Sequence, residues 1–85
     1  MQLKINYFAS VREALGREEE AIEAPDSVQT VADLVAHLSS QDALFAELDS
    51  SDTPLLIAIN HSVVDRSGEV KDQDEVAFFP PMTGG

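Results

Sequence analysis

The first residues of the chain alternate between hydrophobic and polar side chains. Leu3, Ile5 and Tyr7 are each separated by one polar residue. A period of two predicts a strand with one buried face, because successive side chains of a strand point to opposite sides. Phe8 directly follows Tyr7, and the same alternation places it on the outer face.

A short helix and a second strand are predicted next. Ser10 precedes Glu13 by three residues, which is the spacing of a capping box, and Gly16 can end the helix that Ser10 opens. Residues 19–24 carry a weak apolar signal that favours a strand returning beside the first. A turn at residues 25–27 then separates this strand from the longer helix that follows.

The longest helical pattern follows this turn. Thr30 is placed to cap a helix whose apolar residues recur at the i, i+3, i+4 and i+7 positions: Val31, Leu34, Val35 and Leu38. This stripe is typical of a helix that packs on a core. A shorter helical stretch is predicted over residues 42–48, followed by a polar loop over residues 49–54.

The second half of the chain is rich in strand signals. Residues 55–59 form a continuous apolar run, which predicts a central strand buried on both faces. A turn at residues 60–61 leads into a brief strand at residues 62–64. After a turn at residues 72–74, the last strand is predicted over residues 75–79.

The order strand, strand, helix, strand, strand, strand predicts an α+β fold of β-grasp type, in which a mixed sheet of about five strands wraps one main helix. In the last strand, alternation directs Val76 and Phe78 inward and Ala77 and Phe79 outward.

Three apolar residues are candidates for a partner-binding patch. Phe8 and Phe79 are both expected on the outer face, and Val63 joins them if its strand is a neighbour. Large apolar side chains grouped on a surface are typical of a docking site.

Composition limits the classes of function. The chain has 85 residues and a formal charge of -11, from 16 acidic and 5 basic residues. Such a charge repels nucleic acid and anionic membranes, so we expect neither as a partner. The chain contains no cysteine, and His37 and His61 have no third ligand at a recognisable spacing, so no metal site is predicted. We expect one small soluble domain in the cytoplasm, since no signal or membrane segment is evident.

The ending is the candidate reactive site. Pro80 and Pro81 lack backbone N–H groups, so we expect a domain over residues 1–79 and an extended, flexible tail over residues 80–85. From Pro81, an extended tail reaches roughly 15 to 17 Å. Met82 and Thr83 lead to Gly84 and Gly85, which have no Cβ and can enter a narrow channel in a partner.

These residues carry a resemblance over nearly the whole chain. It rests on residues 7–13, residues 55–60 and above all the ending over residues 74–85, which reads DEVAFFPPMTGG. The chain resembles the small, sulfur-carrier subunits of molybdopterin synthase, within the ubiquitin-like β-grasp sulfur carriers. The resemblance implies a β-grasp fold and partner contacts at Phe8, Val63 and Phe79.

The resemblance also implies a chemistry for Gly85. An E1-like adenylyltransferase would use ATP to form a glycyl adenylate, with AMP transiently attached to Gly85, and a persulfide donor would convert it to a thiocarboxylate (1-thioglycine). The tail, Pro80 to Gly84, would then enter the active site of the large catalytic subunit, where Gly85 would donate sulfur to cyclic pyranopterin monophosphate and build the dithiolene. Two small and two large subunits would form a heterotetramer, and this chain would bind no cofactor of its own.

Three other functions fit parts of the pattern. A ubiquitin-like protein modifier would join Gly85 to lysines of other proteins. A sulfur carrier could serve another pathway, such as thiazole or tRNA thiolation. A plain interaction module would use the tail for docking alone.

Overall fold

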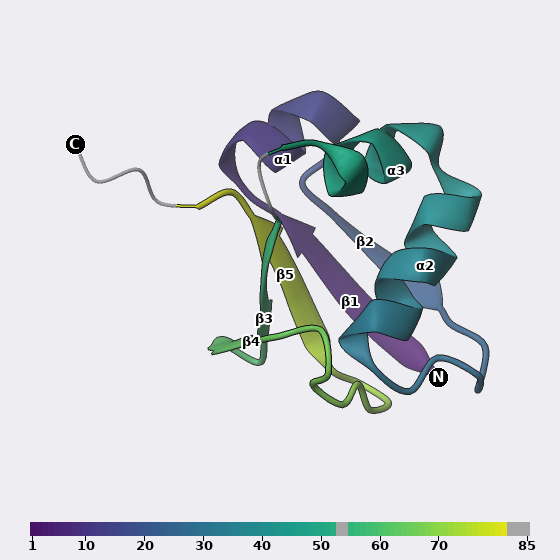
Figure 1. The fold of residues 1–85 in the computed structure, drawn as a ribbon. Coiled ribbons are helices and arrows are strands. Elements are labelled where there is room, and N and C mark those ends of the chain that lie inside the picture. The colour runs from purple at the N-terminus through teal and green to yellow at the C-terminus, as the bar shows by residue number, and fades with distance from the viewer. Residues whose placement is uncertain (53–54, 82–85) are drawn as a thin grey trace.

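The described residues of the computed structural model, 1–52 and 55–81, form a mixed sheet with helices packed against one face (Figure 1). The elements are β1 (Gln2–Tyr7), α1 (Ala9–Leu15), β2 (Glu19–Glu23), α2 (Val31–Gln41), α3 (Ala43–Ser50), β3 (Leu56–Ile59), β4 (Ser62–Val64) and β5 (Glu75–Phe79). The predicted α+β fold with five strands and one main helix is confirmed.

The strand order across the sheet is β2-β1-β5-β3-β4. The last strand of the chain therefore lies at the centre, between the first strand and β3. It runs parallel to β1, with Ile5 opposite Val76 and Tyr7 opposite Phe78, and antiparallel to β3. Because β1 and β5 are parallel, both end at the same edge of the sheet, where α1 and the C-terminal segment begin.

The core lies between the sheet and the helices. Tyr7, Phe45 and Phe78 are fully or almost fully buried there, and the ring of Phe78 meets Phe45 edge-on at 5.1 Å between centroids. The predicted stripe on α2 also faces this core. Because Val76 and Phe78 are both 0% exposed, the predicted alternation of β5 is confirmed.

Arg17 closes the core at the end of β1. Its guanidinium lies 5.3 Å from the centre of the Tyr7 ring, donates to Asp42 Oδ2 at 2.6 Å and pairs with Glu20. Burial, followed by the charge of Glu20, raises the pKa of Tyr7 to about 12. The hydrogen bond from Arg17 lowers the pKa of Asp42, whose carboxylate also accepts from the Leu44 N–H at the start of α3. Arg17 thereby ties the chain after α1 to the start of α3.

Two of the three predicted helix caps are confirmed and one is wrong. Thr30 and Asp33 form the capping box of α2, as the position of Thr30 indicates, and Gly16 ends α1 in the left-handed conformation that glycine adopts readily. The capping box at Ser10 is wrong, because α1 begins at Ala9 with Phe8 as its N-cap residue and no side-chain cap. The hydrogen bond from the Phe8 N–H to the Phe78 carbonyl keeps Phe8 in line with β1 up to the first helical residue.

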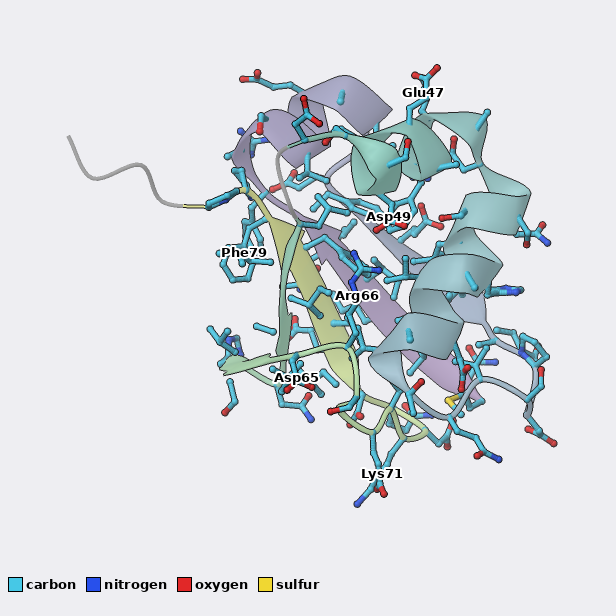
Figure 2. The ribbon with its side chains drawn as sticks, in the orientation of Figure 1. Glu47, Asp49, Asp65, Arg66, Lys71 and Phe79 are labelled. Atoms are coloured by element: carbon cyan, nitrogen blue, oxygen red, sulfur yellow. The ribbon has the colours of Figure 1, made fainter. Side chains whose placement is uncertain are left out.

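Two boundaries of the second half need correction. The polar loop predicted from residue 49 begins later, because α3 continues to Ser50 and Asp49 accepts a hydrogen bond from Arg66 at 2.5 Å; Figure 2 shows these two side chains facing each other. Residues 53–54 of that loop lie outside the described residues. β3 is internal to the sheet, and its predicted burial on both faces holds only in part: Ile57 is buried on the core side and Ala58 on the other side, but Leu56, also on the side away from the helices, is only half-buried.

Candidate docking face

The sheet has an open face on the side opposite the helices, and β5 runs across its middle. Glu75, Ala77 and Phe79 point to this side, since Val76 and Phe78 occupy the core. Figure 2 shows the Phe79 side chain on the far side of the sheet from α2. Phe79 is half-buried, and Pro80 follows it directly, so the last outward side chain of β5 stands where the C-terminal segment begins.

The parallel pairing of β1 and β5 brings Phe8 beside Phe79. Tyr7 lies opposite Phe78, and the Phe8 N–H donates to the Phe78 carbonyl at 3.1 Å, which continues the ladder by one residue. Phe8 is 49% exposed. The structure therefore places these two candidate partner-binding residues next to each other, on the same face and at the same end of the sheet.

Val63, the third candidate, lies farther away. It faces Ala58 across β3 and β4, and Ala58 faces Ala77 across β3 and β5, so all three share the open face. Val63 is 71% exposed, and because β4 is separated from β5 by β3, it stands about 10 Å from the centre of the face. Val63 was expected to join Phe8 and Phe79 if its strand lay next to theirs. It lies on the same face, but β4 is not a neighbour of β1 or β5.

A shallow depression of about 190 Å³ lies within this face. Its floor is low because Ala58 and Ala77, which are paired between the neighbouring strands β3 and β5, have small side chains. The residues that line the depression come from β1, the N-cap of α1, β3, β5 and the turn between β3 and β4: Asn6, Phe8, Ala58, His61, Glu75, Ala77 and Phe79.

The depression has one aromatic end and one polar end. Phe8 and Phe79 form the first end, and Glu75 forms the second with its neighbours. Glu75 Oε2 accepts a hydrogen bond from the Asn6 side-chain amide at 2.7 Å and lies 4.0 Å from Lys4 Nζ, while Oε1 lies 3.6 Å from His61 Nε2. The composition of this lining fits a partner surface that is apolar at one end and polar at the other.

The polar half of this site is not predicted by the sequence pattern. Glu75, Asn6 and His61 are far apart along the chain, and only the pairing of β1 with β5 and the turn after β3 bring them together. The alternation of β5 does place Glu75 on the same side as Phe79, and that was the one available signal. The expected thiocarboxylate and threading residues Met82, Thr83, Gly84 and Gly85 lie outside the described residues, whereas Pro80 and Pro81 are half-buried at the end of β5.

The described residues show neither a metal centre nor a membrane-spanning helix. No group of three or more His, Cys, Asp or Glu side chains in them is arranged to hold a metal ion. No helix formed by these residues is long and apolar enough to cross a membrane.

A central C-terminal strand, a parallel partner strand and one main helix on one face define a β-grasp protein of the ubiquitin-like kind. A model of the ThiS family matches residues 5–85. The molybdopterin synthase sulfur carrier subunit of Escherichia coli (strain K12) is 41% identical over 83 residues, covering 98% of this chain and 99% of that protein. The chain therefore belongs to the ThiS family.

Solved structures agree with this assignment. A Pyrococcus furiosus protein described as subunit 1 of molybdopterin converting factor superimposes with a TM-score of 0.76 at 32% identity, covering 96% of this chain and 99% of that chain. A chain of the Helicobacter pylori complex of subunits 1 and 2 of molybdopterin-converting factor superimposes with a TM-score of 0.67 at 24% identity over 100% of both chains, which supports the fold. The fold and the family inferred from the sequence are confirmed.

Proposed function

We propose that this chain is the sulfur-carrier subunit of a molybdopterin synthase, acting in the cytoplasm. The observation that carries the proposal is the full-length similarity to the Escherichia coli sulfur carrier subunit, which includes 41% identity over 98% of the chain. The ending FFPPMTGG adds a chemical reason, because Gly84 and Gly85 have no Cβ and leave the proposed reactive carboxylate free of bulky neighbouring side chains.

The proposed chemistry takes place at the carboxylate of Gly85. A carboxylate is a poor acyl donor, so an E1-like adenylyltransferase would first join it to AMP and release pyrophosphate from ATP. The terminal sulfur of a persulfide would then attack the glycyl carbonyl and displace AMP. Cleavage of the resulting acyl disulfide by a thiol would leave the thiocarboxylate, whose sulfur is a strong nucleophile.

Sulfur transfer would take place in the large catalytic subunit. The thiocarboxylate sulfur of Gly85 would attack a carbon of cyclic pyranopterin monophosphate, with an oxygen substituent of that carbon as the leaving group. Hydrolysis of the acyl–sulfur bond would then leave the sulfur on the pterin and restore the Gly85 carboxylate. We assign acid–base catalysis to the large subunit, because Thr83 offers the only side-chain hydroxyl among residues 80–85. Two turns of this transfer would build the dithiolene, in a complex in which two carriers cap a dimer of large subunits.

The open face supports a docking role in this scheme. Phe8 and Phe79 lie side by side at the start of the C-terminal segment, so a partner that covers them also receives Pro80 and the residues beyond. Burial of aromatic side chains is a strong source of binding free energy. We propose that the large subunit and the activating enzyme both use this face, one after the other.

Intact-mass spectrometry tests the proposal directly. The chain would be incubated with its activating enzyme, ATP and a persulfide donor, and the expected result is a mass increase equal to the exchange of one oxygen for sulfur. A variant that lacks Gly84 and Gly85 is the control and should keep its mass. Adding the large subunit and cyclic pyranopterin monophosphate should then yield molybdopterin and return the carrier to its original mass.

Two results would contradict the proposal. Covalent high-mass conjugates without thiocarboxylate would indicate a protein modifier. An unchanged C-terminal acid in cells that make the cofactor would indicate an interaction module.

A further inference from the structure

The depression on the open face has the shape and chemistry to hold a single extended side chain. Glu75 and Phe79 stand at its two ends, four residues apart on β5, which corresponds to roughly 13 Å along a strand. The alanines between them, Ala77 on β5 and Ala58 on β3, leave a low apolar floor. A side chain that lies along this floor needs an apolar stem and a polar end group.

Glu75 determines the charge of that end group. Its side chain is 31% exposed, and one carboxylate oxygen, Oε2, already accepts from Asn6. Among the described residues, Oε1 accepts no hydrogen bond, because His61 Nε2 lies 3.6 Å away, beyond hydrogen-bonding distance. One oxygen at the polar end of the depression is therefore available to a donor from outside.

The surrounding charges leave Glu75 incompletely neutralised. Lys4 Nζ is 4.0 Å from Glu75 but 3.5 Å from Glu19, so a single ammonium is shared between two carboxylates. The cluster of Lys4, Glu19 and Glu75 thus carries one net negative charge when His61 is neutral. The formal charge of -11 on the whole chain adds a field of the same sign.

We propose that this depression receives a lysine or arginine side chain of the large catalytic subunit, whose cationic end binds Glu75 Oε1. The stem would lie over Ala77 and Ala58, beside the rings of Phe8 and Phe79. Lys and Arg carry the apolar stem and charged end that such a site requires. This inference rests on the proposed function, because it specifies how the partner recognises the same face.

Other occupants fit less well. An acidic side chain would place a second negative charge next to Glu75, and a purely apolar side chain would bury Oε1 without a hydrogen bond. At the aromatic end, the rings of Phe8 and Phe79 would contact the apolar stem, while the charged end lies beside Glu75.

The test compares Glu75→Gln with Glu19→Gln in binding to the large subunit. Glutamine keeps the length of Glu75 and an oxygen that can accept from Asn6, so the sheet is preserved, but it removes the charge. Glu19 is the matched control, because it shares Lys4 and lies outside the lining of the depression. We expect Glu75→Gln to weaken the dissociation constant roughly tenfold at low salt, and Glu19→Gln to change it less than twofold.

Salt and a second variant sharpen the test. The difference between Glu75→Gln and the unmodified chain should shrink as salt rises, because an ion pair at the surface is screened. Ala77→Leu, which fills the floor, should also weaken binding while the thermal transition remains sharp.

The outcomes separate this inference from the proposed function. Full affinity for the large subunit in both Glu75→Gln and Ala77→Leu would overturn the inference alone. An equal loss of affinity in Glu75→Gln and Glu19→Gln would also overturn the inference, because the loss would then reflect the overall negative charge of the chain and not the depression. No binding of the unmodified chain to the large subunit would contradict the proposed function itself.

Discussion

Phe78 and Phe79 are adjacent in the chain but point to opposite faces of β5, so truncating each to alanine separates folding from docking. Phe78 is 0% exposed, and its ring lies 5.1 Å from that of Phe45 and 6.2 Å from that of Tyr7. Phe79 is half-buried on the open face. The same chemical change at neighbouring positions should therefore affect two different measurements.

The expected losses differ several-fold. Phe78→Ala removes a ring from the core and should lower the free energy of unfolding by about 3 to 5 kcal/mol, a large part of the roughly 5 to 15 kcal/mol that a domain possesses. At about 4 to 8 °C per kcal/mol for a domain of this size, Tm should fall by roughly 12 °C or more. Phe79→Ala should cost about 1 kcal/mol or less in folding.

Binding to the large subunit should show the reverse order. Loss of an aromatic anchor costs about 2 kcal/mol or more, which corresponds to roughly a 30-fold increase in Kd for Phe79→Ala. Thermal denaturation followed by circular dichroism and titration calorimetry with the large subunit would measure the two quantities. Comparable stability losses in the two variants would mean that the register of β5 is wrong, and unchanged affinity in Phe79→Ala would mean that docking uses another face.

Three further predictions concern the tail, the acid range and the overall charge. Deleting Gly85, or adding one residue after it, should abolish precursor conversion without changing Tm, because reacting atoms must approach to about 3 to 3.5 Å; undiminished conversion would contradict this. Asp42→Asn keeps a capping side chain but removes the charge that pairs with Arg17, and it should lower stability at neutral pH. The pKa of Asp42 is lowered in the folded state, so its contribution is present above the ordinary aspartate pKa and is lost as pH falls through the folded-state value; acid denaturation curves of the two proteins should therefore converge at low pH. Finally, association with the large subunit, measured by stopped flow, should slow with rising salt while dissociation changes little, because charge steers encounter and the apolar contacts of Phe8 and Phe79 do not depend on it; a flat association rate would mean that the charge of -11 serves solubility alone.

Local patterns in the sequence were sufficient for most of the elements. The alternation around Val76 and Phe78 predicts which side of β5 is buried, because successive side chains of a strand point to opposite faces of the sheet. The stripe on α2 and the cap at Thr30 are equally local, since they depend on residues within one or two helical turns. The predicted start of α1 at Ser10 was wrong. A hydrogen bond between distant residues, from the Phe8 N–H to the Phe78 carbonyl, keeps Phe8 in line with β1, and α1 begins at the next residue without a side-chain cap.

The sequence by itself determined the elements, the family resemblance and the outward position of Phe79. The tertiary structure alone decided the strand order, the parallel pairing that brings Phe8 next to Phe79, and the separation of Val63 from both. It also assembled the depression, in which Asn6 and Glu75 are 69 residues apart along the chain. The reason is physical: side-chain alternation and helical periodicity are set by neighbouring residues, whereas the choice of partner strand depends on how the whole core packs.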